Sequence, residues 1–113
     1  MFSGNNLEKI HNLGEKKKAS KILPYATSKK ADERAAAATA LGNTSNDDSC
    51  NALIRLLRDS DISVCINAAV ALKKMGRAMA IEHLRQAAKN SNNETFKAAC
   101  HDAVASLVNS GKL

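Results

Sequence analysis

Apolar residues recur along this chain at intervals of three and four, the spacing that places them on one face of an α-helix. The spacing is clearest in two stripes, formed by Leu53, Ile54, Leu56 and Leu57 and by Val64, Ala68, Ala71, Leu72 and Met75. The whole pattern predicts seven helices, near residues 5–13, 15–27, 30–42, 47–58, 62–75, 77–90 and 93–109. The chain is therefore expected to be all-α.

Residues between these stripes carry the signals of helix ends. Gly42 is expected to end the third helix in a left-handed conformation. Asn46 and Asp61 each precede a predicted helix and are expected to act as N-caps. Ser91 and Glu94 have the spacing of a capping box ahead of the last helix.

The apolar pattern repeats with a period of 31 residues. Two registers show it along the chain: Ile10, Leu41 and Leu72, and then Ile22, Leu53 and Leu84. With one extra residue added to the period, Val104 takes the position of Leu72 in the last unit. Each unit holds two helices, and the units lie near residues 1–28, 29–59, 60–91 and 92–113, the last a partial cap. Because such units bury their apolar faces only against neighbours, the sequence predicts a short right-handed α-solenoid of about three and a half helical hairpins.

The segment ADERAAAATALG, at residues 31–42, is rich in alanine and ends at a glycine. Small side chains allow helices to approach closely, so this helix is expected to pack tightly against its own partner helix and against neighbouring units. Leucine in place of Ala37 or Ala40 is expected to overpack the stack.

Four segments carry a resemblance to a known family: RAAAATALG (34–42), ALIRLLRD (52–59), DISV (61–64) and AAVALKKMG (68–76). Together they resemble the short HEAT-like repeat of phycobilin lyase relatives and bacterial adaptor proteins. In that family a valine followed by an arginine opens the first helix of a unit, and an aspartate precedes it. This chain has Asp61 and Val64 in one unit, Arg34 and Lys97 at the basic position of two others, and Cys65 at the middle basic position. The resemblance implies an Asp and Arg ladder that is interrupted at Cys65.

The composition also favours an all-α fold and indicates where in the cell the protein is expected. Three aromatic residues, no tryptophan and one proline argue against a β-sandwich. No apolar run approaches the roughly 18 residues that span a bilayer, and the N-terminus lacks the pattern of a signal peptide, so a cytoplasmic protein is expected. Cys50, Cys65 and Cys100 lie within apolar helical patterns and are expected to be reduced core thiols.

Residues that could carry chemistry are sparse. The chain has no CxxC or HxxxH spacing, and it lacks the His-Glu dipeptides of HEAT-like di-iron hydroxylases. Cys100 and His101 are neighbours on a predicted helix and so point about 100° apart, which does not suit a nucleophile and its base. We therefore expect no catalytic residue, no metal site and no cofactor, with the three histidines at the surface or at the boundary of the core.

The leading binding candidates lie on the second helices of two units. The offset of 31 residues is expected to stack two polar sets beside each other: Asn51, Arg55 and Arg58, and then Glu82, Gln86 and Lys89. The resemblance places partners on the side lined by second helices. We therefore expect a non-catalytic scaffold or adaptor that binds another protein there.

The N-terminal quarter offers an alternative ligand class. Residues 1–30 hold seven lysines and two glutamates, which is +5 of the formal net charge of +6. Nucleic acid or another polyanion is therefore the alternative ligand, bound by Lys16, Lys17, Lys18, Lys21, Lys29 and Lys30. The three consecutive lysines are expected to open a helix, where the helix dipole disfavours them. A tetrapyrrole lyase or chaperone-like role is a weaker alternative, implied only by the family resemblance.

The two ends of so short a stack are expected to leave apolar residues partly uncovered. A homodimer that buries them is a further prediction. The residues concerned are Leu7, Ile10, Leu13, Val104, Leu107 and Val108.

Overall fold

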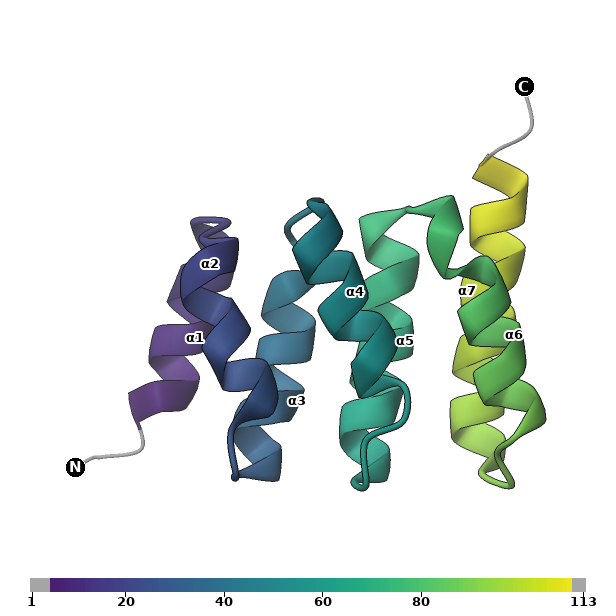
Figure 1. Cartoon of the computed structure of the whole chain (residues 1–113), viewed down its shortest axis with the longest axis horizontal. Helices are drawn as coiled ribbons and strands as arrows, with labels where there is room; N and C mark the ends of the chain where they lie inside the picture. Colours follow the sequence, from purple (N-terminus) through teal and green to yellow (C-terminus); the bar gives the residue numbers. More distant parts are fainter. Residues whose placement is uncertain (1–4, 111–113) are drawn as a thin grey trace.

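The computed structural model describes residues 5–110, which form seven α-helices and two 3₁₀ helices and contain no strand (Figure 1). In chain order the elements are α1 (Asn5–Glu15), α2 (Ala19–Ile22), η1 (Leu23–Thr27), α3 (Ala31–Leu41), α4 (Asp47–Leu56), α5 (Ile62–Met75), η2 (Ala78–Ala80), α6 (Ile81–Lys89) and α7 (Glu94–Ser110). The prediction of an all-α chain is confirmed.

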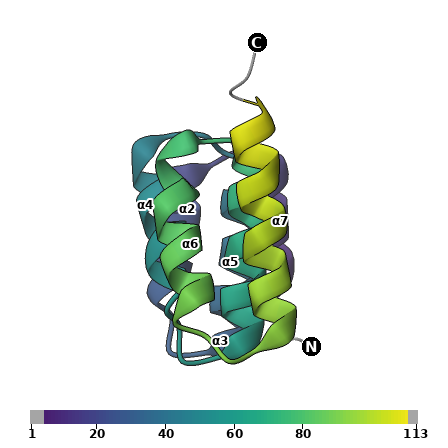
Figure 2. The ribbon, with the colours of Figure 1, turned by 90° about the vertical axis from the view of Figure 1, so that its right-hand side faces the viewer.

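The helices form two layers, which Figure 2 shows edge on. α1, α3, α5 and α7 lie side by side in the first layer, and each packs against the next. α2, α4 and α6 form the second layer, in front of the first in Figure 1. The molecule measures 45 × 32 × 17 Å, so it is a short stack of helices, as expected of an α-solenoid.

η1, α4 and α6 each pack chiefly on the first-layer helix that follows, whereas the short α2 contacts α1 more than α3. η1 lies against α3, α4 lies more closely against α5 than against α3, and α6 lies against α7. The units therefore interlock along the stack. As a consequence, α7 completes the burial of α6 although it has no second helix of its own among the described residues.

The repeat of the sequence coincides with the buried core. All six residues of the two registers have no measurable exposure: Ile10, Leu41 and Leu72, and Ile22, Leu53 and Leu84. Burial of one such side chain stabilises the fold by about 1.5–3 kcal/mol. The exception is Val104, which follows Leu72 in register but is only half-buried, because it lies at the end of the stack.

The alanine-rich helix α3 is the tightest part of the first layer. Ala37 and Ala38 are fully buried between neighbouring helices. A Cβ added to Gly14 of α1 would lie 2.8 Å from the Cβ of Ala40, and one added to Gly42 would lie 3.0 Å from the Cβ of Ala71. Small residues therefore set the spacing of α1, α3 and α5.

The prediction that Gly42 is left-handed is wrong, because its φ is −62°. Close approach to Ala71 requires this glycine, whereas its backbone is ordinary. The left-handed C-cap is Gly76, with a φ of 78° and open space around it. Both glycines end a first-layer helix, but for different physical reasons.

The predicted helix at 15–27 is also wrong in its extent. α1 continues to Glu15 and then closes with Lys17 at a φ of 56°. The N–H of Lys18 donates to the carbonyl of Leu13 at 2.9 Å, and that of Lys17 to the carbonyl of Gly14 at 3.0 Å, which is a Schellman motif. Only four residues of α2 follow before the chain tightens into η1, which has Pro24 in its first turn.

The predicted N-caps are confirmed at two helices and wrong at a third. Asn46 accepts from the N–H of Ser49 at 2.8 Å, and Asp61 accepts from that of Ser63 at 2.9 Å. At the last helix the cap is Asn93, which accepts from the N–H of Phe96 at 2.8 Å. Ser91 instead accepts from the N–H of Asn93, so it supports the cap from two residues earlier.

Candidate functional site

The second-helix face is the surface formed by the outward residues of α2, η1, α4 and α6. All six side chains predicted to bind a partner are exposed on it: Asn51, Arg55, Arg58, Glu82, Gln86 and Lys89. Cys50 and Leu53 hold α4 to the core, and Leu84 and Ala88 hold α6. The helical period therefore separates the core residues of these helices from the polar residues that they present.

A groove of about 440 Å³ crosses this face between η1 and α4. Asn51 and Arg55 line it, as predicted candidates, together with Thr27 and Asp48. Its apolar lining comes from Leu23, Ala26, Ala52 and Leu56. This η1–α4 groove thus combines an apolar surface with donors and acceptors, which is the composition of sites that bind ligands and peptides.

Part of this groove is formed by residues that the sequence pattern does not mark as binding candidates. Asp48 has the position of an acid in the first turn of α4, which is a sufficient local reason for it. Leu23 and Thr27 belong to η1, where a regular helix was expected. Pro24 was the available signal, since proline suits the first turn of a helix and interrupts one that is already running.

The six predicted residues do not all line one groove. α4 packs closely with α5 and α6 with α7, and the expectation that Arg55 and Arg58 stack beside Gln86 and Lys89 stays a prediction. Lys89 instead lines a separate groove between α6 and α7. Glu82 pairs with Arg85 one turn along α6, at 2.5 Å.

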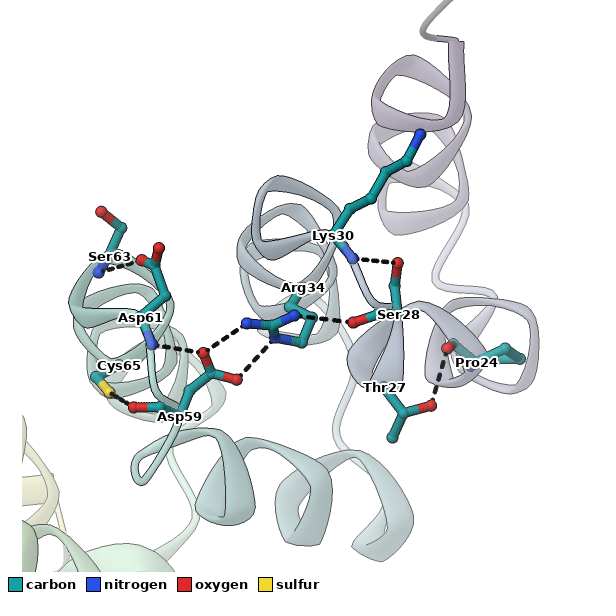
Figure 3. A network of polar contacts seen from close by, with 9 residues as sticks. All are labelled: Pro24, Thr27, Ser28, Lys30, Arg34, Asp59, Asp61, Ser63 and Cys65. Atoms are coloured by element: carbon teal, nitrogen blue, oxygen red, sulfur yellow. Dashed lines mark hydrogen bonds and ion pairs between the residues drawn. The ribbon is translucent and has the colours of Figure 1, made fainter.

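A partly buried ion pair fixes the two elements that border the η1–α4 groove (Figure 3). Arg34 of α3 donates from Nε and Nη2 to the two carboxylate oxygens of Asp59, at 2.8 and 3.0 Å. Its Nη1 donates to the carbonyl of Ser28 at 2.9 Å. Since Ser28 ends η1 and Asp59 follows α4, one guanidinium joins the ends of both elements.

The environment keeps Asp59 ionised. Burial raises the pKa of its carboxyl group, but hydrogen bonds from Arg34 and from the N–H of Asp61, together with the charge of Arg34, outweigh burial, so the pKa lies below its ordinary value. The same contacts raise the pKa of Arg34. The pair is therefore charged throughout the physiological range.

Cys65 occupies the position that Arg34 holds one unit earlier. Its thiol donates to the carbonyl of Asp59 at 3.1 Å, as the guanidinium of Arg34 donates to that of Ser28, and both acceptors lie six residues before the donor. A thiol is too short to reach, in addition, the residue after the second helix of its own unit, as Arg34 reaches Asp59. The ladder is thus interrupted at Cys65, as the resemblance implies, while the contact with the preceding unit is kept.

Further polar contacts join neighbouring units. Glu33 of α3 accepts from the hydroxyl of Ser28 at 2.6 Å and from the side-chain amide of Asn6 at 2.9 Å. These two hydrogen bonds lower the pKa of Glu33. Asn67 of α5 donates to the carbonyl of Ala35 at 3.2 Å. The stack is therefore held by specific hydrogen bonds in addition to its apolar core.

The lysines proposed for a polyanion are divided between the two ends of the first hairpin. Lys16, Lys17 and Lys18 lie at the turn between α1 and α2, whereas Lys29 and Lys30 lie beside the start of α3, at the opposite end (Figure 1). The first three follow the C-terminus of α1, where the dipole favours cations. The expectation that they open a helix is wrong. The unfavourable helix dipole therefore no longer supports a role for these lysines in binding a polyanion.

Polyanion binding by the remaining set stays a prediction. Lys16, Lys17, Lys18 and Lys21 are exposed. Affinity for duplex DNA at two salt concentrations, with and without replacement of the three consecutive lysines by glutamine, tests it.

The cysteines and histidines lie where the sequence predicts them. Cys50, Cys65 and Cys100 are buried and unpaired to one another by disulfides. Burial raises the pKa of each thiol, and it raises that of Cys100 to about 11. The histidines, His11, His83 and His101, are exposed. Within residues 5–110 no three His, Cys, Asp or Glu side chains converge as metal ligands would.

The apolar ends of the stack are better covered than expected. Ile10 is fully buried and Leu107 is 3% exposed, so the prediction that both are uncovered is wrong. Leu7 is exposed, and Leu13, Val104 and Val108 are half-buried. Pairing of two chains stays a prediction for these four residues alone.

None of the described helices is long and apolar enough to cross a bilayer.

Comparison with known families agrees with the architecture. The family of HEAT repeats matches residues 19–105, which include the stack from α2 into α7. The chain therefore belongs to the HEAT repeat family, and the match is to HEAT repeats in general rather than to the phycobilin lyase type. A comparison with curated proteins found no match.

Proposed function

We propose that this chain is a non-catalytic scaffold that binds a partner protein through the second-helix face, centred on the η1–α4 groove. The observation that carries the proposal is the pairing of exposed Asn51 and Arg55 with an apolar lining in one groove. Protein–protein interfaces commonly have such a centre, in which the apolar surface contributes affinity and a few polar groups fix the orientation of the partner.

The supports of the groove favour the same role. Arg34 fixes Ser28 and Asp59 at the ends of its two bordering elements, and α4 is anchored by fully buried Cys50 and Leu53. A surface held in this way loses little conformational freedom when a partner binds, which favours affinity. HEAT repeats generally serve as protein-binding scaffolds, and a repeated rigid framework with a polar face suits that use.

Affinity purification from the cells that make the protein tests the proposal. The tagged wild-type chain is compared with Arg55→Glu and with Lys9→Glu, a matched charge reversal at an exposed position of α1. We expect the wild type and Lys9→Glu to enrich the same protein, and Arg55→Glu to lose it by about tenfold. Equal enrichment by all three chains, or enrichment of no protein, would overturn the proposal.

A further inference from the structure

A second groove, of about 620 Å³, opens between α6 and α7 at the C-terminal end of the stack. Figure 2 looks directly at this end, with α6 and α7 nearest the viewer. Its apolar lining comes from Ala88 of α6 and from Val104, Ala105 and Val108 of α7. We call it the end groove. Of the six partner-binding candidates on the second-helix face, only Lys89 lines it.

The repeat shows what shape this groove accepts. One unit earlier, the positions of Ala88 and Val104 are taken by Leu57 and Leu72, which are 5% and 0% exposed inside the stack, where α7 packs on α5. In the last unit Val104 and Val108 are half-buried and Ala105 is exposed. The end groove is thus the surface on which this architecture places its next helix.

Charge distinguishes the end groove from the equivalent surface inside the stack. Its charged lining is cationic throughout: Arg85, Lys89 and Lys97, with His101 beside them. In register, Lys97 replaces buried Cys65 and His101 replaces buried Ala69. Arg85 already pairs with Glu82, but a further apolar repeat would bury Lys89 and Lys97 without partners, which is costly. The occupant must therefore bring carboxylates to the same helix face.

A second copy of this chain fits that requirement poorly. Two end grooves facing each other would bring their cations together. The outward side of α1, which would follow α7 in a head-to-tail stack, carries Glu8 and Glu15 but also Lys9 and Lys16. Its charges cancel, so it offers no excess of carboxylates.

We propose that the end groove binds an acidic amphipathic helix of another protein, with apolar residues of that helix on Val104 and Val108 and its Asp or Glu residues beside Lys97 and Arg85. This is helix-in-groove recognition, in which anchors at i, i+3 or i+4 and i+7 meet an apolar channel. The site is independent of the η1–α4 groove, and either can fail without the other.

Fluorescence anisotropy with the full chain and labelled, helix-stapled peptides of about 15 residues tests the proposal. The first peptide carries leucine at i, i+3 and i+7 with flanking glutamates. A second carries lysines in place of the glutamates, and a third has the composition of the first in scrambled order. We expect saturable binding of the first peptide alone, weakened by added salt.

Variants then locate the site. Lys97→Glu and Val104→Asp are each expected to weaken the first peptide about tenfold, while Arg55→Glu in the η1–α4 groove leaves its affinity unchanged. Lys97→Gln, which is milder, guards against loss of fold and is expected to weaken binding less than Lys97→Glu. Circular dichroism melts confirm that each variant is folded.

Four results would overturn the proposal. They are failure of the acidic peptide to bind, equal binding of the three peptides, binding that Arg55→Glu removes but Lys97→Glu does not, and competition by short duplex DNA as strong as by unlabelled acidic peptide. Sedimentation that shows self-association abolished by Lys97→Glu would assign the groove to a second copy and would also overturn it.

Discussion

The guanidinium of Arg34 holds both carboxylate oxygens of Asp59, two side chains that are only 16% and 9% exposed and lie at opposite ends of the unit 29–59. A pair with both partners in fixed, two-pronged geometry is a stronger link than a single surface ion pair. The contact joins α3 to the residue that follows α4, and it fixes the border of the η1–α4 groove.

Acid should loosen this link. The pKa of Asp59 and that of Glu33 both lie below their ordinary values in the folded chain. A carboxyl group with a lowered folded pKa stabilises the fold above its unfolded pKa, and that stability is lost as pH falls through the folded pKa. We expect the melting temperature to fall steeply from about pH 5 to about pH 3.

The Asp59→Asn variant isolates its share of this effect. It should melt at a lower temperature than the wild type at neutral pH and show a shallower fall in acid. Glu15→Gln, at an exposed position near the end of α1, is the control and should follow the wild-type curve. Parallel curves for Asp59→Asn and the wild type would contradict the assigned role of the pair.

Close packing of α1 on α3 gives a second prediction. An alanine at Gly14 brings its Cβ to 2.8 Å from that of Ala40, so Gly14→Ala should destabilise the fold by about 1–3 kcal/mol despite the better helix propensity of alanine. Adding Ala40→Gly removes the clash and should recover part of the loss. Ala40→Leu alone should also destabilise by about 1–3 kcal/mol.

Chemical denaturation of four chains measures the coupling between the two positions. The chains are the wild type, Gly14→Ala, Ala40→Gly and the double variant that combines these two changes. Strict additivity would show that α1 and α3 are not in contact there.

Two left-handed residues supply a matched pair of tests. Lys17 has a φ of 56°, where a side chain is strained, so Lys17→Gly should stabilise the fold by about 1 kcal/mol. Gly76 has a φ of 78°, so Gly76→Ala should destabilise it by about 1 kcal/mol even though no atom lies near the new Cβ. Opposite shifts in melting temperature are expected, and shifts of the same sign would contradict the Schellman closure of α1.

The thiols should report burial directly. Cys50, Cys65 and Cys100 are at most 5% exposed, and burial raises the pKa of each. We expect a thiol reagent at about pH 8 to modify none of them in the native chain within the time that it modifies all three in denaturant. Immediate reaction of one thiol in the native state would show that its helix is packed differently.

The core could be predicted because it depends on a period. Ile10, Leu41 and Leu72 recur at 31 residues and are all fully buried, since every unit meets neighbours in the same way. Local closures were harder to predict. Lys17 adopts a left-handed conformation that glycine normally signals, so the end of α1 had no marker in the sequence.

The candidate sites, like the fold, could be predicted only in part. The exposure of Asn51 and Arg55 follows from the helical period alone. Their grouping into a groove depends on η1, whose irregular turn has only Pro24 as a signal. The end groove depends on where the stack stops covering Val104, which no local pattern around that residue reveals.

Site-specific photo-crosslinking tests the central claim, that the second-helix face receives a partner protein. A photoreactive amino acid is placed at Asn51, in the η1–α4 groove, or at Thr39, an exposed position of α3 in the first layer. Both chains are irradiated in extract of the cells that make the protein. We predict that the Asn51 position labels a discrete partner, that unlabelled wild-type chain competes for it, and that the Thr39 position does not label it. Equal labelling from both positions, or labelling from Thr39 alone, would contradict the account.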